Sequence, residues 1–308
     1  MQSICVEQKY ETAEAFLNDL LPWSKHLRLK DYVFRGHTDA DFKLIPTSVR
    51  TYEKNKIGKF TKVGCLLSGQ DKDNEFSLAF AEYQLLRDFY RKADSLGLNV
   101  PRSNILRERL YQEYDSRTLF KIAGGLRWLP FDMLESAGLA QHYGIPTRLL
   151  DWTYDPFVAA FFSSLSNAKE SGDICVWAFN TMVMGNITMG DLNCPLNIVT
   201  PHYSGNPNLA AQKGLFTHWA TDIPLVSNMI DSVVVDRRPL DELVQAYLAD
   251  KNLSVSQPIF IKKLLPVKKA PDLALCLRNL GYGPAKMFPG YAGVAAEMLD
   301  LEQMVWKI

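Results

Sequence analysis

The sequence predicts an α+β fold with a mixed central sheet and flanking helices. Hydrophobic patterns typical of strands and of helices both recur along its 308 residues, but they do not alternate in a regular βα order. No internal repeat and no low-complexity tail is present. The length allows one large domain or a core with a second lobe. We expect a single domain over residues 1–308 with a helical insertion at about 50–130.

The first third of the chain contains one short strand candidate and two amphipathic segments. Thr12 to Leu21 predicts a helix, and Tyr32 to Phe34 predicts a strand that ends at Arg35. A longer helix is predicted from Asn74 to Lys92, because apolar residues recur there at steps of three and four. The stretch between Val49 and Asp73 has weak periodicity, which favours a mobile insertion.

Helix signals become sharper in the second half. A helix is predicted from Asp132 to His142, and another begins after Asp155, which is a good N-cap, with Pro156 at the first helical position. Ile174 to Phe179 has the composition of a buried strand. Further strands are predicted at Ser232 to Val235 and Ile259 to Leu265, and helices at about Leu240 to Ala249, Leu273 to Leu280 and Ala292 to Leu301.

Composition argues against several classes of protein. Lys+Arg and Asp+Glu balance at 34 each, so we expect no broad electrostatic binding of nucleic acid. No secretory leader and no apolar run of membrane-spanning length is visible, so no membrane contact is expected. The five cysteines lack paired spacing, which favours reduced thiols in the cytoplasm over a disulfide framework. They are Cys5, Cys65, Cys175, Cys194 and Cys276.

Arg35 is the first candidate for ligand binding. It follows the apolar pair Val33-Phe34 and precedes Gly36, so its guanidinium should emerge at a strand end that another backbone can approach closely. Such an arginine can bind a phosphate or carboxylate through two hydrogen bonds. The structural alternative is an arginine buried against an acidic residue of its own fold.

A second cluster of candidates lies in the stretch from Gln141 to Thr153. Arg148 offers another anion-binding group, and Asp151 and Thr153 place a carboxylate and a hydroxyl on either side of Trp152. Asp151 is equally suited to be a salt-bridge partner of either arginine, and a tryptophan is more often a core residue than a surface for stacking.

Other site chemistries find little support in the sequence. His142 ends a predicted helix, where a capping imidazole is more common than a general base. The five histidines show no metal-ligand spacing and no Cys-x-x-Cys pair exists, so we predict no metal site. There is also no Walker loop, dinucleotide fingerprint or Gly-x-Ser-x-Gly elbow.

Taken in order, several motifs resemble the FRG domain family. They are Phe34-Arg35-Gly36, the run from His142 to Thr153, Asp155-Pro156 with Ala159 to Phe162, Gln212-x-Gly214-x-Phe216, and Met287-Phe288-Pro289. The resemblance covers about residues 30 to 300. FRG proteins are widespread in bacteria, phages and mobile elements, so the resemblance implies a bacterial or phage setting with a role in phage defence or as a toxin.

A looser resemblance is to ADP-ribosyltransferases of the Arg-Ser-Glu type. It implies that Arg35 binds NAD on the first strand, that Thr153 lies beside the nicotinamide on the second, and that Gln212 begins the third element. Such a transferase usually has Glu in place of Gln212. A neutral amide cannot stabilise a cationic sugar by its charge, so Asp151 or Glu297 would have to do so.

The resemblance therefore implies three catalytic residues and a set that contacts NAD. The catalytic residues are Asp151, Thr153 and Gln212, and the expected NAD-binding residues are Arg35, Gly36, His142, Tyr143, Arg148 and Trp152, with Tyr143 or Trp152 stacking on a ring.

The leading expectation is NAD-dependent ADP-ribosyl transfer or NAD cleavage, with NAD as the substrate, no metal and an acceptor that the sequence does not identify. One alternative is a non-catalytic sensor or effector domain that binds a nucleotide through Arg35 and Arg148. Another is a metal-dependent nuclease, because close carboxylates can organise a metal site. Its candidate ligands are Asp41, Glu135, Asp151 and Asp155.

Overall fold

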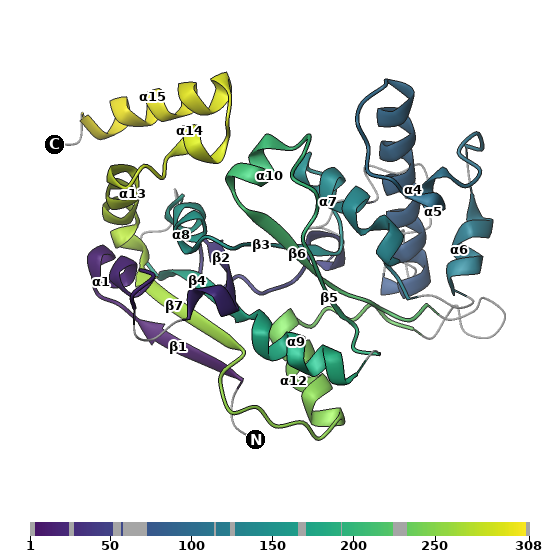
Figure 1. The fold of residues 1–308 in the computed structure, drawn as a ribbon, viewed down its shortest axis with the longest axis horizontal. Helices are drawn as coiled ribbons and strands as arrows, with labels where there is room; N and C mark the ends of the chain where they lie inside the picture. The colour runs from purple at the N-terminus through teal and green to yellow at the C-terminus, as the bar shows by residue number, and fades with distance from the viewer. Residues whose placement is uncertain are drawn as a thin grey trace.

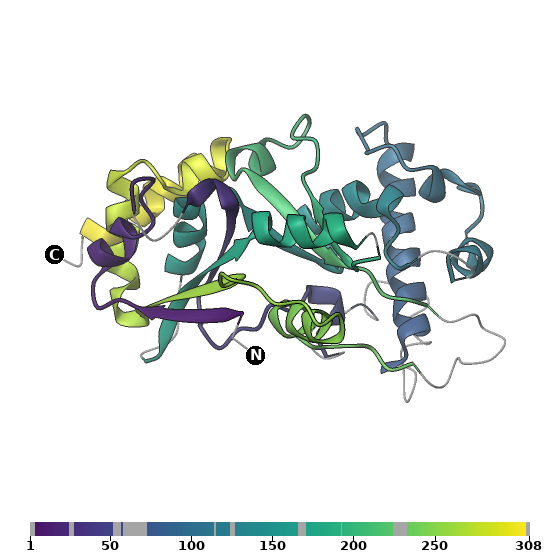
Figure 2. The same ribbon diagram turned by 60° about the horizontal axis from the view of Figure 1, so that its bottom comes forward.

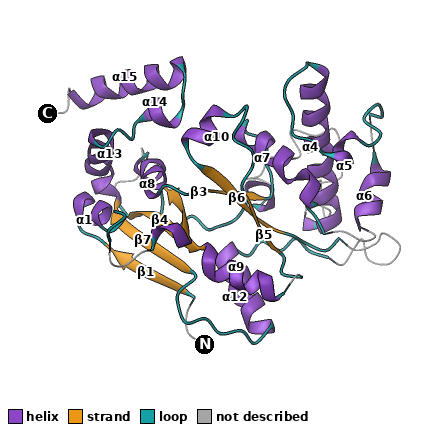
Figure 3. Cartoon of the chain, in the orientation of Figure 1, coloured by secondary structure: helices purple, strands orange, loops and turns teal. Residues whose placement is uncertain are grey.

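In the part of the chain that the structure describes, seven strands form one mixed sheet at the centre of the molecule (Figures 1 and 3). The structure, a computed structural model, describes residues 4–24, 28–51, 57, 73–113, 115–123, 127–165, 171–191, 193–223 and 233–305. Most of the stretch between Val49 and Asp73, for which the sequence predicts a mobile insertion, lies outside these residues. The strands are β1 (Cys5–Lys9), β2 (Tyr32–His37), β3 (Leu149–Thr153), β4 (Asp173–Asn180), β5 (Leu196–Val199), β6 (Gly214–Trp219) and β7 (Phe260–Pro266).

The strand order is β1-β7-β4-β2-β3-β6-β5. β1 pairs with β7 in parallel and all other neighbours are antiparallel, so the predicted α+β fold with a mixed sheet is confirmed. The helices that surround the sheet are α1 (Ala13–Asn18), α4 (Glu75–Ser95), α5 (Asn104–Arg107), α6 (Ser116–Ala123), α7 (Leu134–His142), α8 (Pro156–Ser164), α9 (Thr181–Gly190), α10 (Pro207–Ala211), α12 (Leu240–Asp250), α13 (Ala270–Asn279), α14 (Pro284–Met287) and α15 (Tyr291–Val305).

The two faces of the sheet are covered differently. On one face, α1, α8 and α13 pack on β2, β4 and β7, while α4 and α7 pack on β3, β5 and β6, which gives two separate apolar cores. On the other face, α9 and α12 cover a single core that includes Val33, Trp152 and Phe179. Helices α4 to α6 form one end of the molecule and α13 to α15 the opposite end (Figures 1 and 2).

Helices α4 and α8 begin at capping residues, close to the starts that the sequence predicts. Asn74 accepts a hydrogen bond from the backbone N–H of Ser77 (3.0 Å) at the start of α4. Asp155 accepts from the N–H of Phe157 (3.1 Å) at the start of α8, as expected for an N-cap followed by proline. α4, α5 and α6 lie within the range predicted for a helical insertion.

The strand predicted at Ser232 to Val235 is wrong in the part that the structure describes. Residues 233–235 join no sheet, and Val234 makes only an isolated antiparallel bridge to Asn74. A short apolar run forms a strand only where a neighbouring strand accepts its hydrogen bonds. Among the described residues, no helix is both long and apolar enough to cross a membrane.

Candidate functional site

The sheet opens between β2 and β3. β2 pairs with β4 along all six of its residues, and β3 pairs with β6 along all five of its own, but β2 and β3 pair with each other only at Phe34 and Thr153. A cavity of about 530 Å³ lies at this opening. It is bordered by β2, β3, α8, the end of α7, the start of β6 and the end of α14.

Most of the residues predicted for the site border this one cavity. Those that do are Arg35, Gly36, His142, Asp151, Trp152, Thr153 and Gln212, whereas Tyr143 and Arg148 do not. The side chain of Tyr143 is 66% exposed on the surface and makes an edge contact with the ring of His142.

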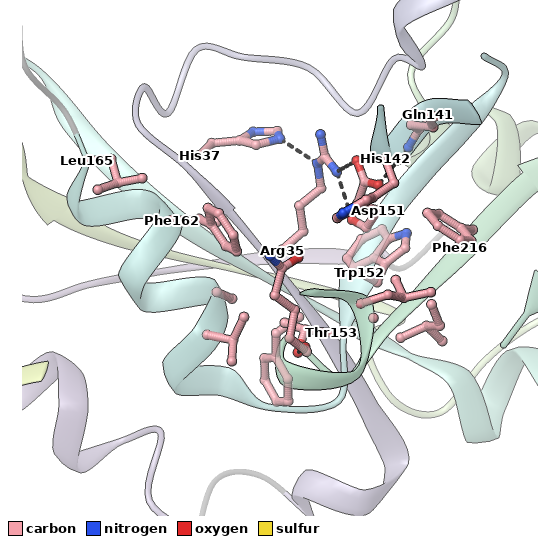
Figure 4. Close-up of a pocket in the computed structure, with 18 of the residues that line it drawn as sticks. Arg35, His37, Gln141, His142, Asp151, Trp152, Thr153, Phe162, Leu165 and Phe216 are labelled. Carbon is pink, nitrogen blue, oxygen red and sulfur yellow. Dashed lines mark hydrogen bonds and ion pairs between the residues drawn. The ribbon is translucent and has the colours of Figure 1, made fainter. Parts of the chain in front are cut away.

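Arg35 reaches across the opening from β2 to β3 (Figure 4). Its Nη1 donates to the backbone oxygen of Asp151 (2.7 Å) and lies 3.4 Å from the Asp151 carboxylate, while its Nε donates to His37 Nε2 (2.9 Å). β2 and β3 pair only at Thr153 and separate before it. At Asp151 the arginine side chain donates the hydrogen bond to β3 that a neighbouring strand would otherwise supply.

Asp151 supplies the negative charge at this position. Gln141 donates to its Oδ1 (2.6 Å), and the hydroxyl of Thr147 donates in turn to Gln141. The carboxylate remains accessible, because the Asp151 side chain is 60% exposed. Among the described residues that border the cavity, Asp151 is the only one with a carboxylate.

A second guanidinium lies close to this pair. Arg50 is held by its Nε, which donates to the backbone oxygen of Ile45 (3.2 Å). Partial burial and the nearby charge of Arg35 lower the pKa of Arg50, and the negative charge of Asp151 opposes that shift. Arg50 does not border the cavity, so it adds positive charge near Arg35 and Asp151 without lining the site.

Thr153 and Gln212 border the cavity but already have protein partners. The hydroxyl of Thr153 donates to the backbone oxygen of Gln212 (2.6 Å) and accepts from the N–H of Asp155 (3.0 Å). The amide of Gln212 donates to the backbone oxygen of Met287 (3.0 Å), which ties the end of α10 to the end of α14. Both side chains thus join chain segments at the edge of the site.

Gly36 borders the cavity on one side and helix α8 on the other. A Cβ atom at this position would lie 2.0 Å from the backbone oxygen of Ala159 and 2.8 Å from the nitrogen of Ser163. Glycine is therefore required here by the close approach of α8 to β2.

His142 lies at the end of α7, where Asn208 donates to its Nε2 (3.2 Å). Burial lowers the pKa of His142, and the charge of Asp151 works in the opposite direction. The lone pair of Nε2 is therefore engaged by Asn208 in this arrangement.

Trp152 is a core residue, although it borders the cavity. Its indole is 3% exposed, packs against Phe179 with ring centroids 5.4 Å apart, and donates to the hydroxyl of Thr217 (2.8 Å). Side chains alternate along a strand, so Trp152 and its neighbour Asp151 leave β3 on opposite faces.

Arg148 is buried away from the cavity. Its guanidinium forms ion pairs with Glu75 (2.5 Å) and Glu82 (2.6 Å), and all three side chains are almost fully buried. Burial works to lower the pKa of Arg148, but the two carboxylates outweigh it and raise that pKa. With both carboxylates in contact, Arg148 joins α4 to β3 and is not positioned to bind a ligand in the cavity.

Apolar side chains border the cavity on both sides of the charged pair: Figure 4 shows Phe162 and Leu165 on one side and Phe216 on the other. Phe162 and Leu165 come from α8 and its end, Phe216 from β6, and Phe288 from the residue after α14. The rings of Phe162 and Phe288 meet edge to face at 6.2 Å. Both residues belong to motifs visible in the sequence. The residues around each one do not indicate that two segments 126 residues apart lie against each other in the fold.

The acids considered for a metal site do not gather at Asp151. Asp155 caps α8 and pairs with Lys213 (2.9 Å), and Glu135 lies 3.9 Å from His202. Glu297 accepts from the N–H of Ala285 (2.8 Å) at the start of α14. Within the part of the chain that the structure describes, no group of three or more His, Cys, Asp or Glu side chains is arranged to hold a metal ion.

Comparison with known proteins gives one match. A family model described as the FRG domain matches residues 30–172, a segment that includes β2, β3, α7 and α8. No curated protein and no solved structure matches the chain.

Proposed function

The chain belongs to the FRG domain family, and from that membership and the geometry of its cavity we propose that it binds NAD and cleaves the bond between ribose and nicotinamide, transferring ADP-ribose to an acceptor or to water. The observation that carries the proposal is the meeting of Arg35 and the accessible Asp151 in a cavity that also has an aromatic wall. Its volume of about 530 Å³ is typical of sites for small molecules.

Each wall suits a different part of a dinucleotide. Arg35, supported by the charge of Arg50, suits a pyrophosphate, because guanidinium groups bind phosphate oxygens through paired N–H donors. Phe162 and Phe288 offer an apolar surface to a planar ring.

Asp151 is the proposed catalytic carboxylate. When the ribose C1′–N bond breaks, its electron pair leaves with nicotinamide and positive charge develops on the ribose. A carboxylate close to the sugar stabilises that charge. Water or an acceptor nucleophile then bonds to C1′ and loses a proton, and Asp151 is the accessible base in the cavity. Gln141, through its 2.6 Å hydrogen bond, fixes the orientation of this carboxylate.

A second candidate function is nucleotide binding without turnover. The observation in its favour is that Thr153 and Gln212, the other two residues expected to be catalytic, are bonded to the backbone oxygens of Gln212 and Met287. If these bonds persist when ligand is bound, Asp151 acts without help from either residue. The same cavity would then serve recognition alone.

The test is to incubate NAD with the purified protein, with and without cell lysate as a source of acceptors, and to measure nicotinamide release by mass spectrometry. We expect Asp151→Asn to reduce release by about 100-fold or more while NAD binding persists, because a charge that acts mainly in the transition state is lost. Arg35→Ala should weaken NAD binding itself. Asp41→Asn, at an exposed aspartate after β2, is the matched control and should match the wild type.

The outcomes separate the candidates. Intact NAD with a folded wild-type protein that binds NAD by calorimetry would favour recognition without turnover. Failure of the folded protein to bind NAD or ADP-ribose would reject the proposal.

A further inference from the structure

The contacts of His37 fix its protonation state. Arg35 Nε donates to His37 Nε2 (2.9 Å), and His37 Nδ1 lies 3.2 Å from the backbone oxygen of Phe42. A carbonyl oxygen can only accept, so Nδ1 carries the proton and Nε2 has the lone pair that accepts from the arginine. The two partners together require a neutral imidazole with its proton on Nδ1.

The surroundings of His37 favour the same state. Its side chain is buried, and the charged groups that act on it are Arg35 on its own strand, Arg50 and Lys262. Burial, together with these three cations, lowers the pKa of His37 to about 3, although the carbonyl of Phe42 works in the opposite direction. The imidazole therefore stays neutral throughout the physiological pH range.

Arg35 is anchored at two of its three nitrogens. Nε is bonded to His37 and Nη1 to Asp151, whereas Nη2 makes no hydrogen bond to any described residue. Figure 4 shows this terminal nitrogen without a bond, on a guanidinium held between His37 and Asp151. A planar guanidinium fixed at two nitrogens has no remaining rotational freedom, so the N–H groups of Nη2 keep one direction.

We propose that His37 is a positioning residue for ligand binding: its neutral imidazole holds Arg35 so that Nη2 presents its N–H groups to a phosphate of the ligand. The inference rests on the proposed binding of a nucleotide in this cavity. Without His37, Arg35 keeps only its contacts to Asp151 and must lose more conformational freedom when the ligand binds. The affinity for the anion decreases accordingly.

The test uses three substitutions at one position. His37→Gln provides an amide oxygen near the place of Nε2 and can still accept from Arg35, whereas His37→Asn is one bond shorter and can bond to Phe42 but does not reach Arg35. His37→Ala removes both contacts. The readout is calorimetric binding of inorganic pyrophosphate and of ADP-ribose to the full chain, with thermal unfolding to confirm that each variant is folded.

We expect affinity to fall about tenfold in His37→Ala and His37→Asn but by less than about threefold in His37→Gln, because one charge-assisted hydrogen bond orders the arginine. In an Arg35→Ala background, His37→Ala should have no further effect, since the arginine that it positions is gone. His202→Ala, at an exposed histidine outside the cavity, should leave affinity unchanged. The positioning role would be overturned if all three His37 variants lost affinity equally. It would also be overturned if His37→Ala lowered affinity as much in the Arg35→Ala background as in the wild type.

Nuclear magnetic resonance separates this inference from the proposed function. Nitrogen chemical shifts of His37 should report a neutral ring with its proton on Nδ1 from pH 5 to 8, and the Arg35 Nε–H should exchange slowly in the wild type and in His37→Gln only. A protonated ring, or equal exchange in all variants, would disprove the contact in solution. If this signature is present but neither pyrophosphate nor ADP-ribose binds, the proposed function fails and the arrangement of the two side chains stands.

Discussion

Gly36 is the residue with the strictest steric requirement at the site. It belongs to β2, borders the cavity and faces the backbone of α8, and a Cβ atom here would lie 2.0 Å from the oxygen of Ala159. Arg35 and His37, on either side of it, point to the opposite face of the strand. The glycine thus allows α8 to lie close behind the strand that carries Arg35 and His37.

Replacing Gly36 with alanine should destabilise the protein by about 3 kcal/mol, because backbone atoms of α8 cannot move aside without breaking helix hydrogen bonds. The control is Gly185→Ala in α9, where nothing lies within 4 Å of an added Cβ. That substitution should stabilise the protein by up to about 1 kcal/mol, since alanine favours the helix more than glycine does. Denaturant unfolding measures both, and equal effects would refute the steric argument.

At the residue scale, the sequence could predict which groups carry charge but not which of them pair inside the fold. Arg35 and Asp151 were recognisable by residue type and flanking motif, but the predicted strand end at Arg35 is wrong, because Arg35 lies within β2 and pairs with Trp177. Arg148 has an equally suggestive local context, but its partners Glu75 and Glu82 are more than 60 residues away on α4. Only the packing of α4 on the sheet reveals that Arg148 is occupied.

At the scale of elements, His218 joins β6 to the segment that precedes α7. It is 1% exposed, and its Nε2 accepts from the N–H of Leu129 (2.9 Å). Burial, followed by the positive charge of Arg148, lowers the pKa of His218 from 6.5 to about 4. This contact therefore requires a neutral ring.

His218 should make the folded state sensitive to acid. His218 binds a proton near pH 6.5 in the unfolded chain but only near pH 4 in the folded chain. The folded state therefore has its full stability above pH 6.5 and loses stability as the pH falls from 6.5 towards 4. From pH 7.5 to 5 the loss due to His218 should be about 2 kcal/mol. His218→Gln keeps an acceptor for Leu129 without titrating. Between pH 7.5 and 5 the unfolding free energy of this variant should therefore decrease by about 2 kcal/mol less than that of the wild type. An unchanged pH dependence in this variant would disprove the assignment.

The sequence predicted some elements better than others for physical reasons. α4 and α8 have capping residues, Asn74 and Asp155, that mark their starts. β1 and β5 are the edges of the sheet, and their residues do not alternate cleanly between apolar and polar because only one neighbour and part of one face constrain them. Such strands are defined by their partners more than by their own composition.

For the whole molecule, the segment matched by the family model is not a complete structural unit. Of the strands that the structure describes, residues 30–172 contain only β2 and β3, and these two strands pair at a single position. Their full-length partners, β4 and β6, begin at Asp173 and Gly214. The cavity also needs Gln212 and Phe288 from outside the matched segment.

A fragment of residues 30–172 should therefore fail to fold alone, whereas the full chain unfolds cooperatively. Two strands joined by one residue pair lack the third strand that a stable sheet needs. Circular dichroism and amide dispersion in nuclear magnetic resonance spectra test this directly. A dispersed spectrum from the fragment would show that the remaining strands are dispensable for folding.

The single pairing of Phe34 with Thr153 also has a mechanical consequence. It divides the sheet into two halves, β1-β7-β4-β2 and β3-β6-β5, whose backbones pair at this one position and which share the core under α9 and α12. Arg35 belongs to one half and Asp151 to the other. A ligand that contacted both residues would link the two halves beside their single backbone pairing, so filling the cavity should slow amide exchange in β2 and β3.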